Sequence, residues 1–185
     1  MELPLSYGTR ITSELSGLKA MLTLTCAVYT EAVEFFAEVF EKEWTVVRSF
    51  SMFALKPYIE SVTHKTKKRP NVKYPFDDKF PNFPSYLSRS AVAKAFGAVK
   101  SYHSHYDKWE AGGKKGNAPS FPKFSRELPT LYYGNMFDFT NKEGKRLPDS
   151  ELSEFARVKM FCSQRQLMQD RKLTKKEKRA VKKGT

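Results

Sequence analysis

The sequence lacks the features by which membrane proteins, secreted proteins and redox proteins are usually recognised. It has no run of 18 apolar residues, which a membrane-spanning helix would need. Its first residues lack the basic start and small-residue cleavage site of a signal peptide. The two cysteines, Cys26 and Cys162, lie far apart and form no C-x-x-C pair, which argues against a zinc ribbon or a redox motif. We therefore expect reduced thiols in a cytoplasmic protein without a membrane partner.

Motifs of catalysis and metal binding are also missing. No G-x-x-x-x-G-K-[ST], H-E-x-x-H or G-x-S-x-G occurs in the chain. Of the three histidines, His103 and His105 are two residues apart in a predicted helix and point in different directions, and His64 lies in a basic run. The sequence thus predicts no metal site, no cofactor and no catalytic residues, and we expect a protein that is not an enzyme.

Positive charge, in contrast, is abundant and unevenly distributed. The net charge is +13. Residues 1–60 carry five Lys or Arg against eight Asp or Glu, whereas residues 61–185 carry 28 against 12. A chain with this asymmetry is expected to bind a polyanion through its second part. Nucleic acid is the first candidate, ahead of an anionic membrane surface.

Hydrophobic periodicity predicts two long helices. The first begins near Thr12 or Ser13 and has one apolar face over nearly 30 residues. That face comprises Leu15, Leu18, Leu22, Cys26, Tyr29, Val33, Phe36 and Phe40. Four residues outside it are expected to face solvent: Glu31, Glu34, Glu38 and Glu41. The second long helix begins near Ser85 or Ser88 and ends at Gly112-Gly113. Its apolar stripe comprises Val92, Phe96, Val99, Tyr102 or His103, and Tyr106.

A less regular helix is expected between the two long ones. Its apolar residues fall on more than one face of Trp44–Val62, and we expect it to end near Pro57 or just after Ile59. A basic and Pro-rich connector without regular structure follows at residues 63–84.

Alternating patterns predict short strands on either side of the helices. The strands are expected at residues 2–7, 131–139 and 155–161, with a turn at Asn141–Gly144. The remaining residues from 165 onward are rich in Lys and Arg and poor in apolar residues, so we expect a solvated basic tail.

The segment from Asn82 to Phe139 combines cations with flat aromatic rings, the side chains that hold nucleic-acid backbones and bases. Its helix runs into a Gly/Lys turn, A-G-G-K-K-G, and then into an F-P-K-F clasp that Pro122 keeps out of a helix. Candidate phosphate contacts are Lys94, Lys100, Lys114, Lys115, Lys123 and Arg126. The alternative is that these cations only solvate the surface and that the aromatic residues pack the core.

The order of these motifs resembles the N-terminal half of the OrfB/TnpB proteins of insertion-sequence transposons. The resemblance rests on L-S-R-S-A-V-A-K-A-F-G-A-V-K-S-Y, G-K-K-G-N-A-P-S-F-P-K-F and Y-Y-G-N-M-F, and with the first helix it spans about residues 15–140. It implies an α+β fold in which a helical recognition lobe of about three helices is inserted in a partial wedge-type β-barrel. It also implies a clamp on guide RNA and duplex DNA, with Arg89, Ser90 and Lys94 facing the motif-bearing duplex.

The chain departs from that family in the parts that cut DNA. It contains neither the RuvC-like Asp/Glu/Asp set nor the four-cysteine zinc motif, and the sequence after Phe161 looks unlike the family. We therefore expect a nucleic-acid-binding N-terminal fragment of an RNA-guided endonuclease that has no nuclease activity of its own. The alternatives are a helix-turn-helix regulator of a transposon and a transposase remnant without function.

The expected domain organisation follows from these patterns. A first wedge strand would occupy residues 1–12, and the helical lobe residues 13–112, with the connector at 63–84. The clasp and the wedge strands would occupy residues 113–162, and the basic tail residues 163–185. Nothing in the sequence sets the oligomeric state.

Overall fold

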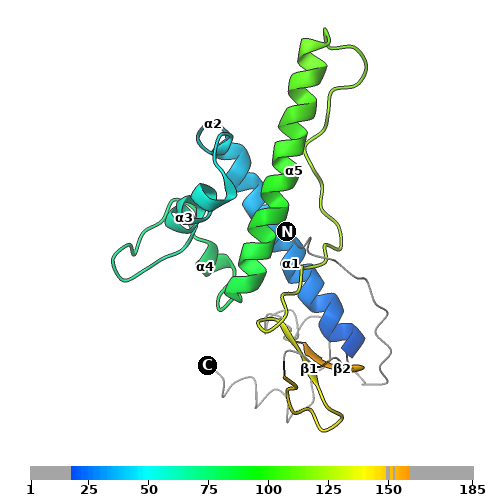
Figure 1. The fold of residues 1–185 in the computed structure, drawn as a ribbon. Helices are drawn as coiled ribbons and strands as arrows, with labels where there is room; N and C mark the ends of the chain where they lie inside the picture. Colours follow the sequence, from blue (N-terminus) through cyan, green and yellow to red (C-terminus); the bar gives the residue numbers. More distant parts are fainter. Residues whose placement is uncertain (1–17, 149–150, 152, 159–185) are drawn as a thin grey trace.

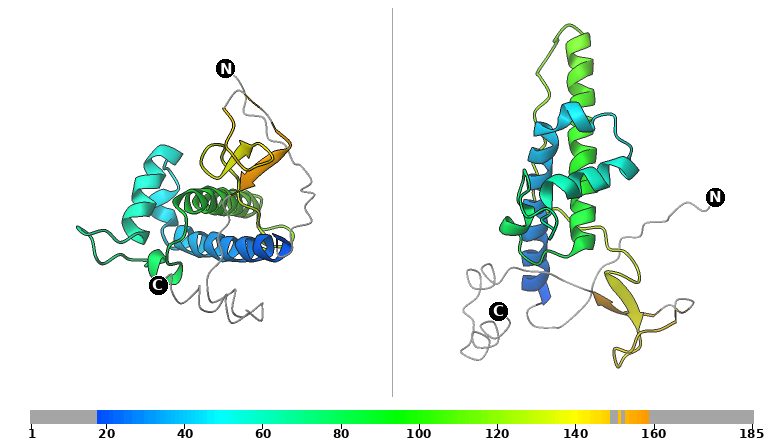
Figure 2. Two further views of the ribbon diagram at one scale, coloured as in Figure 1. Left: turned by 90° about the horizontal axis from the view of Figure 1, so that it is seen from below. Right: turned by 90° about the vertical axis from the view of Figure 1, so that its left-hand side faces the viewer.

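Two long helices lie at the centre of the computed structural model, which describes residues 18–148, 151 and 153–158. Helix α1 is Leu18–Lys42 and helix α5 is Ser85–Ala111. They lie side by side and run in the same direction, and α5 continues beyond the end of α1 (Figures 1 and 2). None of the helices in the described residues is long and apolar enough to cross a membrane.

The apolar face predicted for the first helix is the face that α1 buries. Its four central aromatic and aliphatic members, Tyr29, Val33, Phe36 and Phe40, are fully buried. On α5 the small residues Ala91 and Ala95 are fully buried in the same core, which allows close packing of neighbouring helices. The predicted solvent-facing residues of α1 are all exposed: Glu31, Glu34, Glu38 and Glu41.

The less regular helix is divided into α2, Trp44–Val47, and α3, Met52–Thr63. Ser51 starts α3, because its side-chain oxygen accepts the N–H of Ala54 at 3.3 Å. The prediction that the helix ends at Pro57 or just after Ile59 is wrong. Proline removes one helical hydrogen bond, but the helix continues because one of its faces stays buried in the core. That face comprises Leu55, Ile59 and Thr63.

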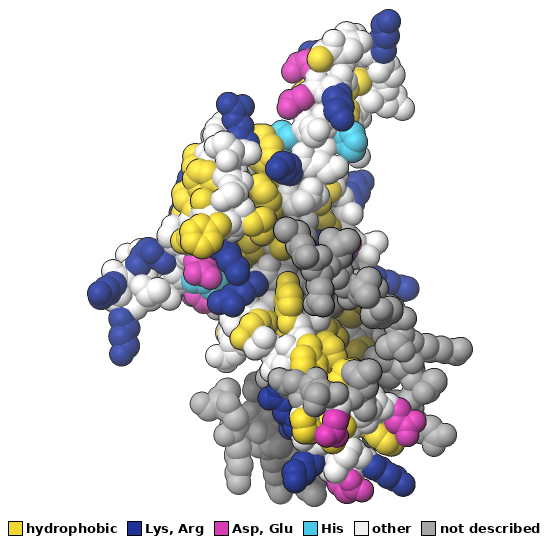
Figure 3. Space-filling model, viewed as in Figure 1, with side chains coloured by type: hydrophobic (Ala, Val, Ile, Leu, Met, Phe, Trp, Pro, Cys, Tyr) yellow, Lys and Arg dark blue, Asp and Glu magenta, His cyan; other side chains and the backbone are white. Residues whose placement is uncertain are grey.

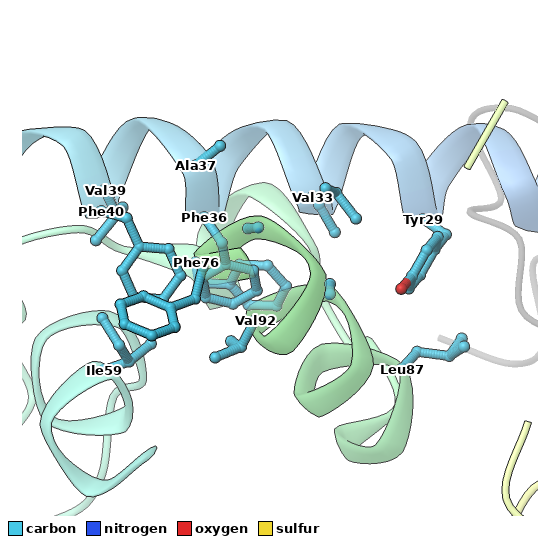
Figure 4. Packing of buried hydrophobic residues seen from close by; sticks show 14 of the residues in the cluster. Tyr29, Val33, Phe36, Ala37, Val39, Phe40, Ile59, Phe76, Leu87 and Val92 are labelled. Carbon is cyan, nitrogen blue, oxygen red and sulfur yellow. The ribbon is translucent and has the colours of Figure 1, made fainter. Parts of the chain in front are cut away.

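The connector between α3 and α5 contributes an aromatic anchor to the core. We predicted an irregular loop here, but the connector contains a short helix, α4, Phe76–Lys79. The ring of Phe76 stacks on Phe36 with 4.8 Å between ring centroids (Figure 4). It also contacts Phe35 edge-on at 5.3 Å. The apolar periodicity of a four-residue helix is too short to see in the sequence.

A buried carboxylate ties the connector to the start of α2. Glu43 is 5% exposed, and its two oxygens accept hydrogen bonds from the hydroxyls of Tyr58 and Tyr74, both at 2.6 Å. Lys73 adds a charged hydrogen bond to the same group. These bonds, of which the one from Lys73 acts most strongly, lower the pKa of Glu43 to about 2.

The strands after the helices form a small antiparallel sheet beyond the N-terminal ends of α1 and α5 (Figures 1 and 2). In this sheet β1, Phe137–Thr140, pairs with β2, Phe155–Val158, so that Asp138 lies opposite Arg157 and forms an ion pair with it at 3.0 Å. The described part of the chain is therefore α+β, with these two strands as its only sheet.

The boundaries of the sheet differ in part from the prediction. The strand expected at residues 131–139 begins only at 137, because a turn closed by a 2.7 Å hydrogen bond from the Met136 amide to Tyr132 precedes it. The turn at Asn141–Gly144 is confirmed by a 3.0 Å hydrogen bond between its end residues. The strand expected at 2–7 and the basic tail lie outside the described residues, as does Cys162.

Candidate nucleic-acid interface

The chain that leaves α5 turns back and follows that helix toward its start (Figure 1). We call residues 112–131 the return segment; it contains no helix or strand. The ring of Phe121 contacts Tyr102 edge-on with 5.5 Å between centroids, and the amide of Thr130 donates to the Ser90 hydroxyl at 3.1 Å. Later positions of the segment therefore lie beside earlier positions of the helix. Phe121 and Phe124, the aromatic residues of the predicted clasp, pack against the core.

The turn at the far end of α5 is built by glycines, as the sequence predicts. Gly113 and Gly116 have positive φ angles of 75° and 76°, which favour glycine. The amide of Lys114 donates to the carbonyl of Trp109 at 2.9 Å, and the indole N–H of Trp109 donates to the carbonyl of Gly116 at 3.3 Å. The Lys114 amide is therefore occupied within the turn and is not free to bind a phosphate.

Five of the predicted site residues lie along the return segment and the adjoining face of α5. We call this group the basic ridge; it consists of Lys94, Lys114, Lys115, Lys123 and Arg126. Because an α-helix rises about 1.5 Å per residue, the part of α5 that the return segment follows is about 30 Å long. The cations of the ridge therefore form a line along the helix and do not converge on one pocket.

The members of the basic ridge differ in how far their charge is already neutralised. Lys94 forms an ion pair with Glu127, and Lys114 forms one with Glu110 at 3.1 Å. Lys115, Lys123 and Arg126 are exposed, and within the described residues they have no ion-pair partner. These three side chains are the cations of the ridge whose charge no carboxylate of the described residues neutralises.

Three other predicted site residues are not part of the ridge: Lys100, whose side chain lies over the ring of Phe96 at 5.9 Å, Ser90 and Arg89. Ser90 is only 4% exposed, and its hydroxyl bonds to the hydroxyl of Tyr29 at 2.8 Å as well as to the Thr130 amide. Its role in this structure is to join α1, α5 and the return segment. Arg89 is exposed, but it lies over the ring of Tyr86 at 5.5 Å and borders a groove with α3, away from the ridge.

The histidine and cysteine side chains, which the sequence offers as possible metal ligands or reactive groups, were also located in the structure. His103 stacks on Trp44 with 4.2 Å between centroids and bonds to Glu41 at 2.8 Å, which ties α5 to the end of α1. Burial raises the pKa of the Cys26 thiol. In residues 18–148, 151 and 153–158, no group of three or more His, Cys, Asp or Glu could hold a metal ion.

Sequence reasoning did not find the partners that neutralise part of the ridge or the groove beside Arg89. Glu127 is 33 positions from Lys94 along the chain, so no local pattern connects them. The sequence contained one indication of the groove. Apolar residues such as Met52 and Phe53 occur on a second face of the segment that forms α3.

The chain is similar to a known protein family over most of its length. The model of the Aq_aa04 family matches residues 6–179, which is nearly the whole chain. No curated protein and no solved structure matches it.

Proposed function

We propose that this chain, which belongs to the Aq_aa04 family, binds the sugar–phosphate backbone of a nucleic acid along the basic ridge. One observation carries the proposal. Lys115, Lys123 and Arg126 are exposed, have no ion-pair partner within the described residues, and are held along a single segment that follows α5.

The linear arrangement favours a polymer over a small anion. Phosphates follow one another about every 3.4 Å along a strand of B-DNA, so a ridge of about 30 Å passes roughly nine of them. A small anion is usually held by cations and amides that converge on one point, as in phosphate-binding nests. The ridge cations do not converge, and the Lys114 amide is already bonded to Trp109.

Backbone conformation supplies a second argument. Lys114 and Arg126 have positive φ angles of 58° and 53°, in the left-handed region that glycine occupies without strain. A non-glycine residue there costs about 1–2 kcal/mol. Strained backbone concentrates at functional sites, and a long cationic side chain at both positions is consistent with selection for its charge.

The opposite sign of charge on α1 would direct the polymer to the ridge. The exposed carboxylates of Glu31, Glu34, Glu38 and Glu41 lie along the second half of α1. A polyanion is repelled from this surface and attracted to the return segment, so the bound orientation is restricted before any contact forms.

The finer form of the proposal comes from the resemblance to OrfB/TnpB proteins. In this form the ridge holds a guide RNA and its duplex DNA target in the cytoplasm, and β1 and β2 belong to a wedge-type barrel around the helical lobe. The order of helical lobe, return segment and paired strands supports it. In this form the chain binds nucleic acid without cutting it, because the catalytic carboxylates of OrfB/TnpB proteins have no counterpart in the sequence.

The direct test compares two variants with the same decrease in charge. In the ridge variant Lys115, Lys123 and Arg126 are changed to Ala. In the control variant Lys67, Lys68 and Lys142 are changed to Ala; these lysines are exposed in two other turns. Fluorescence anisotropy with labelled RNA and duplex DNA measures both affinities. We expect the ridge variant to bind at least tenfold more weakly than the control variant, since three cations no longer neutralise phosphates.

Three results would contradict this function as proposed. Equal affinity of the ridge variant and the control variant would mean that net charge alone attracts nucleic acid. A dimer that binds one duplex sequence and ignores RNA would support the helix-turn-helix regulator instead. Nicking of DNA by the purified chain in the presence of Mg²⁺ would show that the chain does more than bind.

A further inference from the structure

A second basic and aromatic surface lies between α3 and the start of α5, apart from the basic ridge. It is an open groove of about 580 Å³ lined by Met52, Phe53, Lys56, Pro57, Glu60 and Arg89. Figure 3 shows hydrophobic side chains gathered over α2 and α3 with Lys and Arg side chains near them. Of the predicted site residues, only Arg89 belongs to this groove.

The phenylalanine in the groove contributes little to the fold. Phe53 is 89% exposed, whereas Leu55 and Ile59 on the opposite face of α3 are fully buried. Burying a phenylalanine side chain stabilises a protein by about 1.5–3 kcal/mol. The exposed ring of Phe53 does not make this contribution. An exposed ring beside Lys56 and Arg89 combines a stacking surface with cations.

A hydrogen-bond acceptor lies in the same place. Glu60 lines the groove together with Phe53, Lys56 and Arg89, and its carboxylate can accept a hydrogen bond. A ligand that suits this groove therefore has a flat ring, a hydrogen-bond donor and an anionic group.

We propose that the groove holds an unpaired nucleotide of a single-stranded nucleic acid. The base stacks on Phe53, an amino group of the base donates to an acceptor of the groove, and the phosphate lies against Lys56 and Arg89. The inference rests on the proposed function, because it names the form of nucleic acid that the chain takes. Paired bases in a duplex are stacked on one another and cannot offer a free face to the ring.

The charges of the groove argue against two other occupants. An acidic peptide would place its carboxylates against the cations, but its acidic side chains have no aromatic ring to stack on Phe53. A second copy of the chain would bring an identical surface with the same excess of cations over carboxylates, so like charges would oppose it. A nucleotide satisfies ring, acceptor and cation together.

The experiment compares three substitutions of Phe53 in the full chain. Phe53→Tyr keeps the stacking ring, Phe53→Leu keeps apolar volume without a ring, and Phe53→Ala removes both. Anisotropy is measured with an unstructured single strand and with a duplex of the same length. We expect Phe53→Leu and Phe53→Ala to bind the single strand about 5- to 150-fold more weakly and Phe53→Tyr to bind it like the wild type. Duplex affinity stays unchanged in all three.

Arg89→Ala gives an independent readout of the phosphate contact. It should make the negative slope of log affinity against log salt for the single strand shallower by about 0.7. Phe53→Leu leaves that slope unchanged, since it removes no charge. Thermal unfolding checks that each variant folds, and the exposure of Phe53 makes a large change unexpected.

The outcomes separate this inference from the proposed function. Equal single-strand affinity of Phe53→Leu and Phe53→Tyr would overturn the proposal that the groove holds a nucleotide. The ridge variant could still lose binding in that case, and the proposed function would stand. An unchanged affinity of the ridge variant would overturn the proposed function, and with it the premise of the groove. A dimer that Phe53→Ala converts to a monomer would show that the groove is a contact between copies, and would also overturn the inference.

Discussion

The hydroxyl of Tyr29 on α1 lies 2.8 Å from the hydroxyl of Ser90 on α5. Because Ser90 also accepts the amide of Thr130, one small side chain joins both long helices to the return segment. Ser90 was a candidate for contact with nucleic acid, but its buried position gives it a different role. It helps to fix the return segment along α5, and the basic ridge depends on that placement.

Removal of the Ser90 hydroxyl is therefore expected to destabilise the fold. Ser90→Ala leaves the Tyr29 hydroxyl and the Thr130 amide without this partner, and should lower the free energy of unfolding by about 1–3 kcal/mol. Ser104→Ala, at an exposed position of α5, serves as the control and should change it by less than about 0.5 kcal/mol. Urea unfolding followed by circular dichroism measures both. Equal effects of the two substitutions would contradict this role of Ser90.

The buried carboxylate of Glu43 predicts a dependence of stability on pH. Its pKa in the folded chain is about 2, below the ordinary value of 4.5. Its contribution is therefore complete above about pH 4.5 and is lost as the pH falls toward 2. We expect Glu43→Gln to lower the free energy of unfolding by about 2 kcal/mol at pH 7 and the difference from wild type to shrink below pH 4.5.

The matched control for this prediction is Glu38→Gln. Glu38 is an exposed member of the acidic row on α1, and its substitution should leave the profile of stability against pH parallel to that of the wild type. A Glu43→Gln chain whose deficit is the same at pH 3 and pH 7 would show that the charge of Glu43 is not what stabilises the network.

Phe76 and Phe53 form a second matched pair, because one ring is buried and the other is exposed. Phe76 is 0% exposed and stacks on Phe36, whereas Phe53 is 89% exposed. We expect Phe76→Ala to lower the free energy of unfolding by about 3–5 kcal/mol and Phe53→Ala to change it by less than about 0.5 kcal/mol. Chemical unfolding of the two variants measures the difference. If Phe76→Ala lowered the free energy of unfolding as little as Phe53→Ala does, the short helix α4 would not anchor the connector.

The long helices could be predicted because a single rule governs them. Tyr29, Val33 and Phe36 recur at helical spacing and bury one face. After the end of α5 the chain turns at Gly113, which has a positive φ angle of 75°. Short elements depend on tertiary contacts instead. Burial of one face of α3 carries the helix through Pro57, and core packing of Phe76 accompanies the four-residue helix α4. Neither effect is local in sequence.

The basic ridge could be predicted as a set of residues but not as a geometry. Lys115, Lys123 and Arg126 stood out by charge and by their glycine- and proline-rich context. The pairing of Lys94 with Glu127 arises only once the return segment lies against α5. The exposure of Phe53 was equally hidden, since an apolar residue in a helix is normally expected to be buried.

The left-handed conformation of Arg126 predicts that stability and binding change in opposite directions. Its φ angle is 53°, which glycine adopts without strain. We expect Arg126→Gly to keep or raise the free energy of unfolding, by up to about 1 kcal/mol, while nucleic-acid affinity falls. Arg126→Ala removes the same charge but keeps the strain, so it should weaken binding without stabilising the chain. A decrease of stability in Arg126→Gly alone would contradict the assignment of strain.

Salt dependence tests the central claim most directly, because it reports how many phosphates the protein neutralises. The slope of log affinity against log salt for duplex DNA is negative, and it becomes shallower by about 0.9 for each phosphate that is no longer neutralised. We predict that the ridge variant, with Lys115, Lys123 and Arg126 changed to Ala, has a slope about 2.7 units shallower than the wild type. The control variant, with Lys67, Lys68 and Lys142 changed to Ala, should keep the wild-type slope. Identical slopes for the ridge variant and the wild type would contradict binding along the ridge.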